Sequence, residues 1–281
     1  MSGVANAVGK VAGVVAAGAL VVGAFATGNP GLVALAAKVG SIASIASPVA
    51  ATSLPVPRKP LMTAINIFED GHNAYILSDT AVLDASGKVA CFASKAFAFP
   101  EVRMAIAVSG RPIMAPLISA MDRHIRVPTP AAFLAGIPEA FADVMREVAK
   151  ANPAAEATGG NATRLWIASY DMVAGRPRLH TLGNSHIGGA APLLPGAMSE
   201  IRDGHSSPPF DPAVLPFGYI ANPKKDGRRV IESQRRWRFP EYAAGYGVGG
   251  HAELYTIGRA GVTFDRVATW PQDRVGKRID A

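Results

Sequence analysis

The sequence of 281 residues contains a single cysteine, Cys91, and its six histidines show no spacing typical of metal ligands. One cysteine rules out an internal disulfide, and without clustered Cys or His residues the sequence predicts neither a metal site nor another bound cofactor. The sequence also lacks a phosphate-binding loop and the Gly-x-Ser-x-Gly motif of a nucleophile elbow. We interpret Cys91 as a small, buried apolar residue of the core.

Charge is scarce and unevenly placed. Only 17% of the residues are charged and 49% are hydrophobic, which permits a sizeable core and argues against disorder over most of the length. The formal net charge is nevertheless +7, and much of it comes from seven basic residues in one stretch: Lys224, Lys225, Arg228, Arg229, Arg235, Arg236 and Arg238. Only Trp237 adds an aromatic ring there, and no nucleic-acid-binding motif is present. We therefore expect a solvated or subunit-facing helix and no specific binding of nucleic acid.

The first 53 residues are almost free of charge and of aromatic rings. They consist mainly of Ala, Gly, Val, Ser and Ile, and no charge occurs between Val11 and Ala37. The turn signal Gly28-Asn29-Pro30 divides this stretch into two short helices, and small residues recur at four-residue spacing, which lets helix backbones approach closely. The sequence thus predicts an apolar helical arm at residues 1–53, a Pro-rich linker at 54–62 and one domain at 63–281.

Three interpretations of this arm remain open. Val11–Thr27 has 17 residues, which is the short limit for a membrane-spanning helix, and it is poor in Leu and Phe. It also has features of a secretory signal peptide, with Lys10 as the positive end and Ala24-Phe25-Ala26 as a cleavage site, although a second apolar segment follows at once. The interpretation we favour is a self-associating arm that is buried in an assembly and is later released into a membrane.

From residue 63 onward the pattern becomes regular. Alternating apolar and polar residues predict strands within segments 62–68 and 74–84, and further strands are expected within segments 88–99, 102–110, 163–171, 176–184 and 252–270. Apolar residues at helical spacing predict helices at 115–125 and 130–151, and the basic stretch 225–238 is a candidate third helix. Residues 188–223 are rich in Pro and Gly and have no clear pattern. This order of elements predicts an α+β fold in which helices cover antiparallel sheets.

The first strands of this domain carry the spacing of a known family. Asp79 lies 16 residues after Thr63, and Lys95 lies 32 residues after it. Together with the segments LSDTAV, AVSGRPIMAPLI, WIASYDMVAGRPRLHTL and GGHAELYTIGRAGV, this spacing resembles the proteasome β-subunit family and its bacterial relatives. The resemblance covers roughly residues 63–267. It implies a proteasome-like N-terminal-nucleophile (Ntn) hydrolase fold, an αββα sandwich in which helices cover two antiparallel sheets.

The resemblance also implies a catalytic group made of Thr63, Asp79, Lys95 and Gly110. A Thr hydroxyl is a weak nucleophile until a base removes its proton, and the free α-amine of the same residue can be that base. A neighbouring Lys ammonium would lower the pKa of that amine, and Asp79 would hold Lys95 in place. A backbone N–H near Gly110 would stabilise the oxyanion. The amine exists only if the chain is cut between Met62 and Thr63.

Several departures from the family pattern favour an inactive relative. Self-processing members usually carry Gly before the Thr, where this chain has Met62. The family's late Ser-Gly-Gly appears as Val248-Gly249-Gly250, and its accompanying Asp falls at Gly245. In an inactive relative, Thr63 would only open a strand beside an inherited ion pair. A threonine hydrolase remains the alternative.

The arm has a resemblance of its own. Its segments VANAVGKVAGVVAAGALVVGAFATG and GLVALAAKVGSIASIASP resemble the Gly/Ala-rich leaders of distal tail proteins from long-tailed bacteriophages. That resemblance implies a structural virion component at the tail tip or baseplate. Its domain would contact copies of itself and neighbouring tail proteins, and residues 1–53 would lie in the tail lumen until they meet the host membrane. The alternatives are a self-processing threonine amidohydrolase, in the bacterial cytoplasm or associated with its membrane, and an exported bacterial protein whose signal peptide is removed.

Overall fold

The computed structural model describes residues 63–84, 86–124, 129–153, 162–184, 197–202, 204–216, 218–239 and 245–280. The predicted arm at residues 1–53 and the linker at 54–62 lie outside the described residues, so all interpretations of the arm remain predictions. In the described part of the chain, no helix combines the length and the apolar character needed to cross a membrane.

The first sheet has five antiparallel strands in the order β10-β1-β2-β13-β14. Their bounds are β1 Ile65–Glu69, β2 Ala74–Asp79, β10 His205–Ser207, β13 His251–Gly258 and β14 Gly261–Thr269. Alternation along β1 gives it two different faces. Ile65 and Ile67 join the core between the sheets, whereas Asn66 exchanges two hydrogen bonds of 2.9 Å with Gln234 on the other side.

The second sheet is also antiparallel, with five strands in the order β5-β6-β7-β8-β9. Their bounds are β5 Ala96–Phe99, β6 Met104–Gly110, β7 Thr163–Asp171, β8 Arg176–Gly183 and β9 Ser199–Ile201. Two short ribbons pair β3 (Ala81–Leu83) with β4 (Val89–Phe92) and β11 (Arg238–Phe239) with β12 (Gly245–Tyr246). The strand predicted at 88–99 is therefore two strands. They are separated at residues 93–95, where the chain passes from the β3–β4 ribbon to the second sheet.

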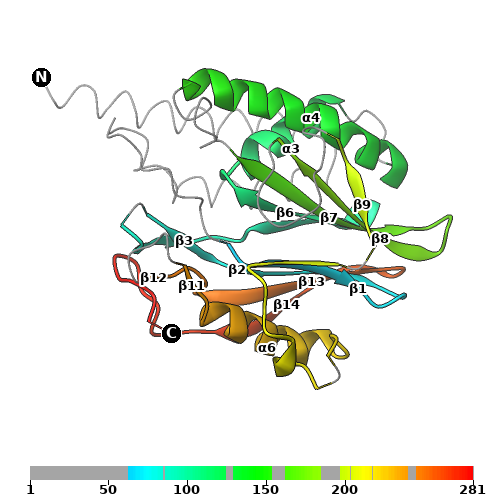
Figure 1. The fold of residues 1–281 in the computed structure, drawn as a ribbon. Helices are drawn as coiled ribbons and strands as arrows, with labels where there is room; N and C mark the ends of the chain where they lie inside the picture. The colour runs from blue at the N-terminus through cyan, green and yellow to red at the C-terminus, as the bar shows by residue number, and fades with distance from the viewer. Residues whose placement is uncertain are drawn as a thin grey trace, which may run out of the picture. The chain divides into compact units, whose positions relative to one another are not determined.

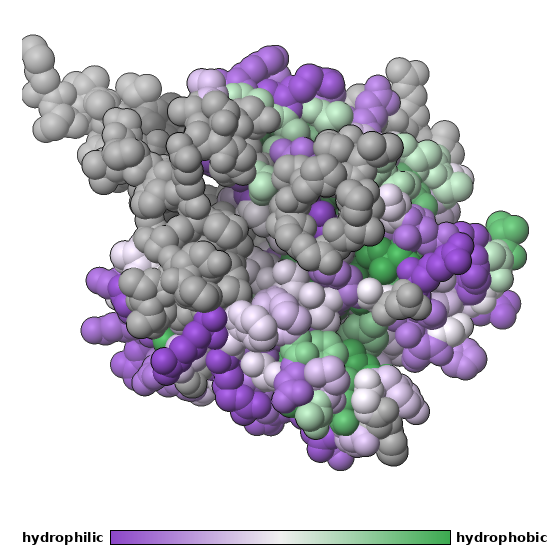
Figure 2. Space-filling model, viewed as in Figure 1, coloured by the Kyte–Doolittle hydropathy of each residue, from purple (hydrophilic) through white to green (hydrophobic). Residues whose placement is uncertain are grey.

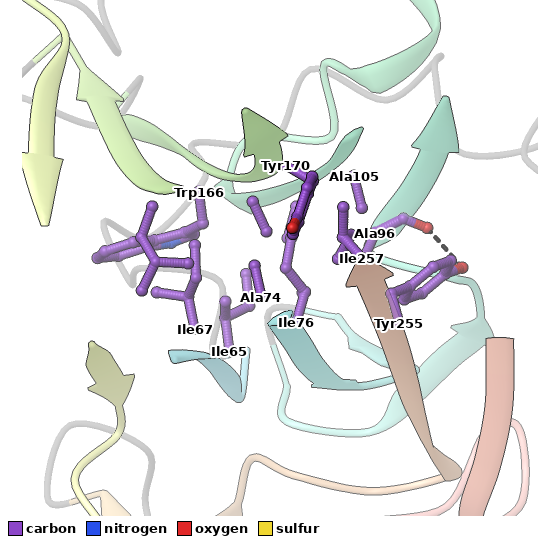
Figure 3. Packing of buried hydrophobic residues seen from close by; sticks show 13 residues of the cluster. Ile65, Ile67, Ala74, Ile76, Ala96, Ala105, Trp166, Tyr170, Tyr255 and Ile257 are labelled. Carbon is purple, nitrogen blue, oxygen red and sulfur yellow. Dashed lines mark hydrogen bonds between the residues drawn. The ribbon is translucent and has the colours of Figure 1, made fainter. Parts of the chain in front are cut away.

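The core lies between the inner faces of the two sheets, as Figure 3 shows. The first sheet contributes mostly large side chains: Ile65, Ile67, Ala74, Ile76, Tyr255 and Ile257. The second contributes several small ones beside a few large ones: Ala96, Ala105, Ala107, Ala168, Trp166, Tyr170 and Leu179. Small residues opposite large ones let the two faces fill the space between them.

Helices cover the outer faces of the sheets (Figure 1). Helix α6 (Pro223–Arg235) buries Val230 and Ile231 against the first sheet. Helices α3 (Met114–His124) and α4 (Pro130–Ala151) lie over the second sheet, where the rings of Phe133 and Phe99 are 5.0 Å apart. The outer side of α4 is largely hydrophilic (Figure 2). The described residues also form two short 3-10 helices, η1 (Pro100–Val102) and η2 (Pro212–Val214).

The described residues confirm the prediction of antiparallel sheets combined with a few helices. The prediction for the basic stretch needs two corrections. Its helix begins at Pro223, because Asn222 caps it by accepting a hydrogen bond from Lys225 N at 3.1 Å, and it ends at Arg235. Arg235 is buried, with 4% of its surface exposed, although we expected a solvated or subunit-facing residue there.

Candidate active site

Thr63 and Asp79 lie close together at one end of the first sheet, because β1 and β2 pair antiparallel. Ile65 is opposite Ser78, which places Ala64 beside Asp79. Asp79 N donates to Ala64 O at 3.3 Å, and Ala64 N donates to Asp79 Oδ1 at 2.9 Å. Thr63 is thus one peptide bond away from a residue that is hydrogen-bonded to Asp79 twice.

Lys95 reaches the same carboxylate from the loop between β4 and β5. Its Nζ lies 2.5 Å from Asp79 Oδ1, the oxygen that also accepts from Ala64 N. The side chain of Asp79 is fully buried and that of Lys95 is 8% exposed. The backbone fixes the loop on both sides: Ala93 N donates to Thr80 O at 2.8 Å, and Val108 N donates to Lys95 O at 2.9 Å. The buried Asp79–Lys95 pair expected from the sequence spacing is confirmed.

The surroundings of Lys95 favour its neutral form more than water does. Burial lowers the pKa of its ammonium group, and the Asp79 carboxylate opposes that effect through its charge and its hydrogen bond. Cys91 and Glu253 oppose it as well. Cys91 is half-buried and not fully buried as we expected; burial raises the pKa of its thiol, and the charge of Lys95 lowers it. The lysine therefore has one close counter-ion in a largely dry environment.

Backbone N–H groups alone bind the second oxygen of Asp79. Its Oδ2 accepts from Ala81 N at 3.2 Å and from Gly249 N at 3.0 Å. A side chain at position 249 has no room, since a Cβ there would lie 2.6 Å from Asp273 Oδ2 and 2.7 Å from Ile279 Cδ1. Gly249 belongs to the segment in which this chain departs from the family's Ser-Gly-Gly. Its main chain, and not a side-chain hydroxyl, contacts the carboxylate.

A second buried ion pair holds that segment in place, and the sequence reasoning missed it. Arg235 donates from both terminal nitrogens to the two oxygens of Asp273, each at 2.7 Å. Arg235 Nη1 also donates to Val248 O at 2.9 Å, and Gly250 N donates to Asp273 Oδ2 at 2.7 Å. The residues on both sides of Gly249 are thus fixed by a pair from α6 and the C-terminal segment. Such a forked, charge-assisted contact imposes a specific geometry.

Gly110 lies on β6, two residues after Val108, whose N–H group donates to Lys95 O. Its φ of +94° belongs to the left-handed region, and a Cβ would lie 2.1 Å from Ala162 O, so both the conformation and the space require glycine. The hydrogen bonds of Asp79 bring it together with Lys95 and with Ala64, the residue that follows Thr63. Gly110 is on a neighbouring strand of the second sheet, and its role as oxyanion donor stays a prediction.

A polar cluster adjoins Lys95 on β13, and the sequence reasoning missed this cluster too. Ser94 Oγ lies 2.6 Å from Glu253 Oε2 and donates to it, and Tyr255 Oη donates to Ala96 O at 2.8 Å. Burial, followed by the charge of Glu253, raises the pKa of Tyr255 above its ordinary value. In the sequence, the only sign of this cluster was the alternation of β13, which places Glu253 on the same face of the sheet as Tyr255. Among the described residues, no group of three or more His, Cys, Asp or Glu side chains could hold a metal ion.

Comparison with known proteins finds similarity at the level of structure. No family model and no curated protein matches the chain. One similar solved structure is an Anbu (Gly-1) mutant from Hyphomicrobium sp. strain MC1, at 12% identity and a TM-score of 0.50, over 75% of this chain and 89% of that chain. Another is Anbu (ancestral beta-subunit) from Yersinia bercovieri, at 9% identity and a TM-score of 0.51, over 75% and 88%. The chain thus has a fold related to that of these Anbu proteins, and at such identities the likeness concerns the fold alone.

Proposed function

We propose that the described domain is an Ntn hydrolase with the αββα sandwich of that class, and that Thr63 becomes its nucleophile when the chain is cut after Met62. The observation that carries this proposal is the buried Lys95–Asp79 contact of 2.5 Å, made on the oxygen that also binds the residue after Thr63. Buried lysines are rare because desolvation of an ammonium group is costly, and they concentrate at functional sites.

The proposed reaction assigns a separate task to each residue. The α-amine of the cut chain accepts the proton of Thr63 Oγ1, which attacks the carbonyl carbon of an amide. The charge of Lys95 keeps the amine unprotonated near neutral pH, and Asp79 holds Lys95 in position. The N–H of Gly110 donates to the developing oxyanion. The amine returns its proton to the leaving nitrogen, and water then hydrolyses the ester on Thr63.

The mass of the N-terminus of the native protein tests this proposal. We expect a chain that begins at Thr63 and an amidase activity that Thr63→Ala abolishes while Thr63→Ser retains part of it. Thr269→Ala is the matched control, because Thr269 is exposed at the end of β14 in the first sheet. Two results would overturn the proposal. One is a native protein whose N-terminus is intact, whether or not the protein is active, and the other is an amidase activity that survives Thr63→Ala.

A second candidate is the non-catalytic packing module of a bacteriophage tail tip or baseplate. It is supported by Met62 in place of Gly before Thr63 and by the Gly/Ala-rich composition of residues 1–53. The domain would associate with itself and with neighbouring tail proteins, which is compatible with its likeness to a protein named as an ancestral beta-subunit. The arm would contact the host membrane. This candidate requires an uncut chain, and an exported protein would instead begin near residue 26, so the same mass measurement separates all three functions.

A further inference from the structure

Arg164 is a buried cation without a carboxylate partner among the described residues. It is 2% exposed, its Nε has no hydrogen-bond partner, and none of the described ion pairs includes it. Burial lowers the pKa of its guanidinium, and no described acidic group opposes that effect. Arginine is almost never fully buried unless it is paired, because the uncompensated charge is expensive. This residue therefore requires an explanation that the fold does not supply.

The guanidinium group lies at the inner face of the second sheet. Its central carbon is 5.3 Å from the centre of the Trp166 ring, and Trp166 belongs to the core between the sheets (Figure 3). The same ring also stacks on His205 of the first sheet, with ring centres 4.3 Å apart and planes at 14°. Burial and the charge of Arg164 lower the pKa of His205 to about 4, so the imidazole is neutral at pH 7. The cluster as a whole carries one positive charge.

The register connects Arg164 with the candidate active site. Arg164 is opposite Ser109 on β6, and Gly110, the proposed oxyanion donor, is the next residue. From the first sheet, Ser78 is opposite Ile65 and shares its inward face. The hydroxyl of Ser78 is also buried without a hydrogen-bond partner. Two of the unpartnered buried polar atoms thus come from opposite sheets at the end that holds Thr63.

From this placement we propose that Arg164 is the recognition residue for a carboxylate of the substrate, so that the hydrolase acts on acidic peptides. The inference rests on the function proposed above. A monoanion matches the single positive charge, whereas a phosphate dianion would leave a second buried charge without compensation. A guanidinium also suits a carboxylate because its N–H groups can bind both oxygens. The contact with the Trp166 ring leaves the Nε–H group of Arg164 without a hydrogen-bond partner.

The test measures binding of three peptides to the whole protein by calorimetry. Acetyl-Ala-Ala-Glu-amide carries a side-chain carboxylate, acetyl-Ala-Ala-Gln-amide is its neutral match, and acetyl-Ala-Ala-Ala with a free C-terminus carries a terminal carboxylate. We expect the wild type to bind one of the two acidic peptides about 10- to 100-fold more tightly than the Gln peptide, and the preferred one identifies the source of the carboxylate. Equal binding of all three peptides, or no binding of any, overturns the inference.

Variants assign that preference to Arg164. Arg164→Gln should remove it, and Arg164→Lys should restore part of it, because an ammonium keeps the charge but not the forked geometry. Arg176→Gln is the matched control, because Arg176 is exposed on β8 of the same sheet. An acidic preference that survives Arg164→Gln overturns the inference. Binding that depends on Arg164 but leads to no cleavage would support this site and refute the hydrolase. Cleavage without a preference for acidic peptides would support the hydrolase and refute this site.

Discussion

Replacing Lys95 by Met tests the ion pair on which the candidate site depends. The change keeps most of the side-chain volume and removes the ammonium that lies 2.5 Å from Asp79. Removing one partner of a buried pair costs about 3–5 kcal/mol, because the other charge stays buried. Asp79 would still accept hydrogen bonds from the backbone of Ala64, Ala81 and Gly249. Since hydrogen bonds stabilise a stranded carboxylate, we expect a loss at the lower end, about 3 kcal/mol.

Thermal unfolding followed by circular dichroism measures this loss. For a domain of about 150–250 residues, 1 kcal/mol shifts Tm by about 2–4 °C, so Lys95→Met should lower Tm by about 6–12 °C. Lys150→Met is the matched control: it breaks a Lys150–Glu147 pair whose side chains are 71% and 72% exposed. Exposed pairs contribute about 0.2–1 kcal/mol, so the control should change Tm much less. Equal shifts in the two variants would refute the reasoning about burial.

Two further predictions concern the core and the arm. Burial lowers the pKa of His205 to about 4 from an ordinary value of 6.5, so its contribution to stability is complete above pH 6.5 and is lost as the pH falls through 4. His205→Phe keeps a ring on Trp166, and its urea midpoint should fall less between pH 7 and pH 4; identical pH dependences would contradict this. Deleting residues 1–53 should give a soluble monomer, whereas the full chain should oligomerise or float with liposomes, because its small apolar side chains gain little by folding alone. A full-length chain that is monomeric and does not bind liposomes would remove the main support for a tail-tip role.

Local patterns predicted the regular elements well. The helix expected at 130–151 has those bounds, since Thr129 accepts a hydrogen bond from Ala132 N at 3.2 Å and Pro130 begins the helix. Strand β7 also matches its predicted segment, because its apolar run and the turn at Gly175 that follows it are both visible in the sequence. Residues 188–223 were different. Strands β9 and β10 have three residues each and exist only as edges of sheets built by distant segments.

The site was predictable only in part, because most of its contacts are long-range. We predicted the Asp79–Lys95 pair from a spacing that resembles a known family, and not from the local sequence pattern. Charge alone placed Arg235 on a solvated face, since its partner Asp273 is 38 residues further along the chain. The contact of Gly249 N with Asp79 spans 170 residues and involves no side chain of Gly249, so no residue pattern marks it.

Asp79 and Lys95 differ in how many of their hydrogen-bonding groups are used by described residues. Among the described residues, Asp79 accepts from Lys95 Nζ and from the N–H groups of Ala64, Ala81 and Gly249, so both of its oxygens are occupied. Lys95 Nζ, by contrast, makes no described hydrogen bond except the one to Asp79, although an ammonium group has three N–H donors. Asp79 therefore suits a fixed positioning role and is a poor candidate for a base. Lys95 retains donors for a group beside Thr63, which is what the proposed chemistry requires of it and what a purely structural pair would not use.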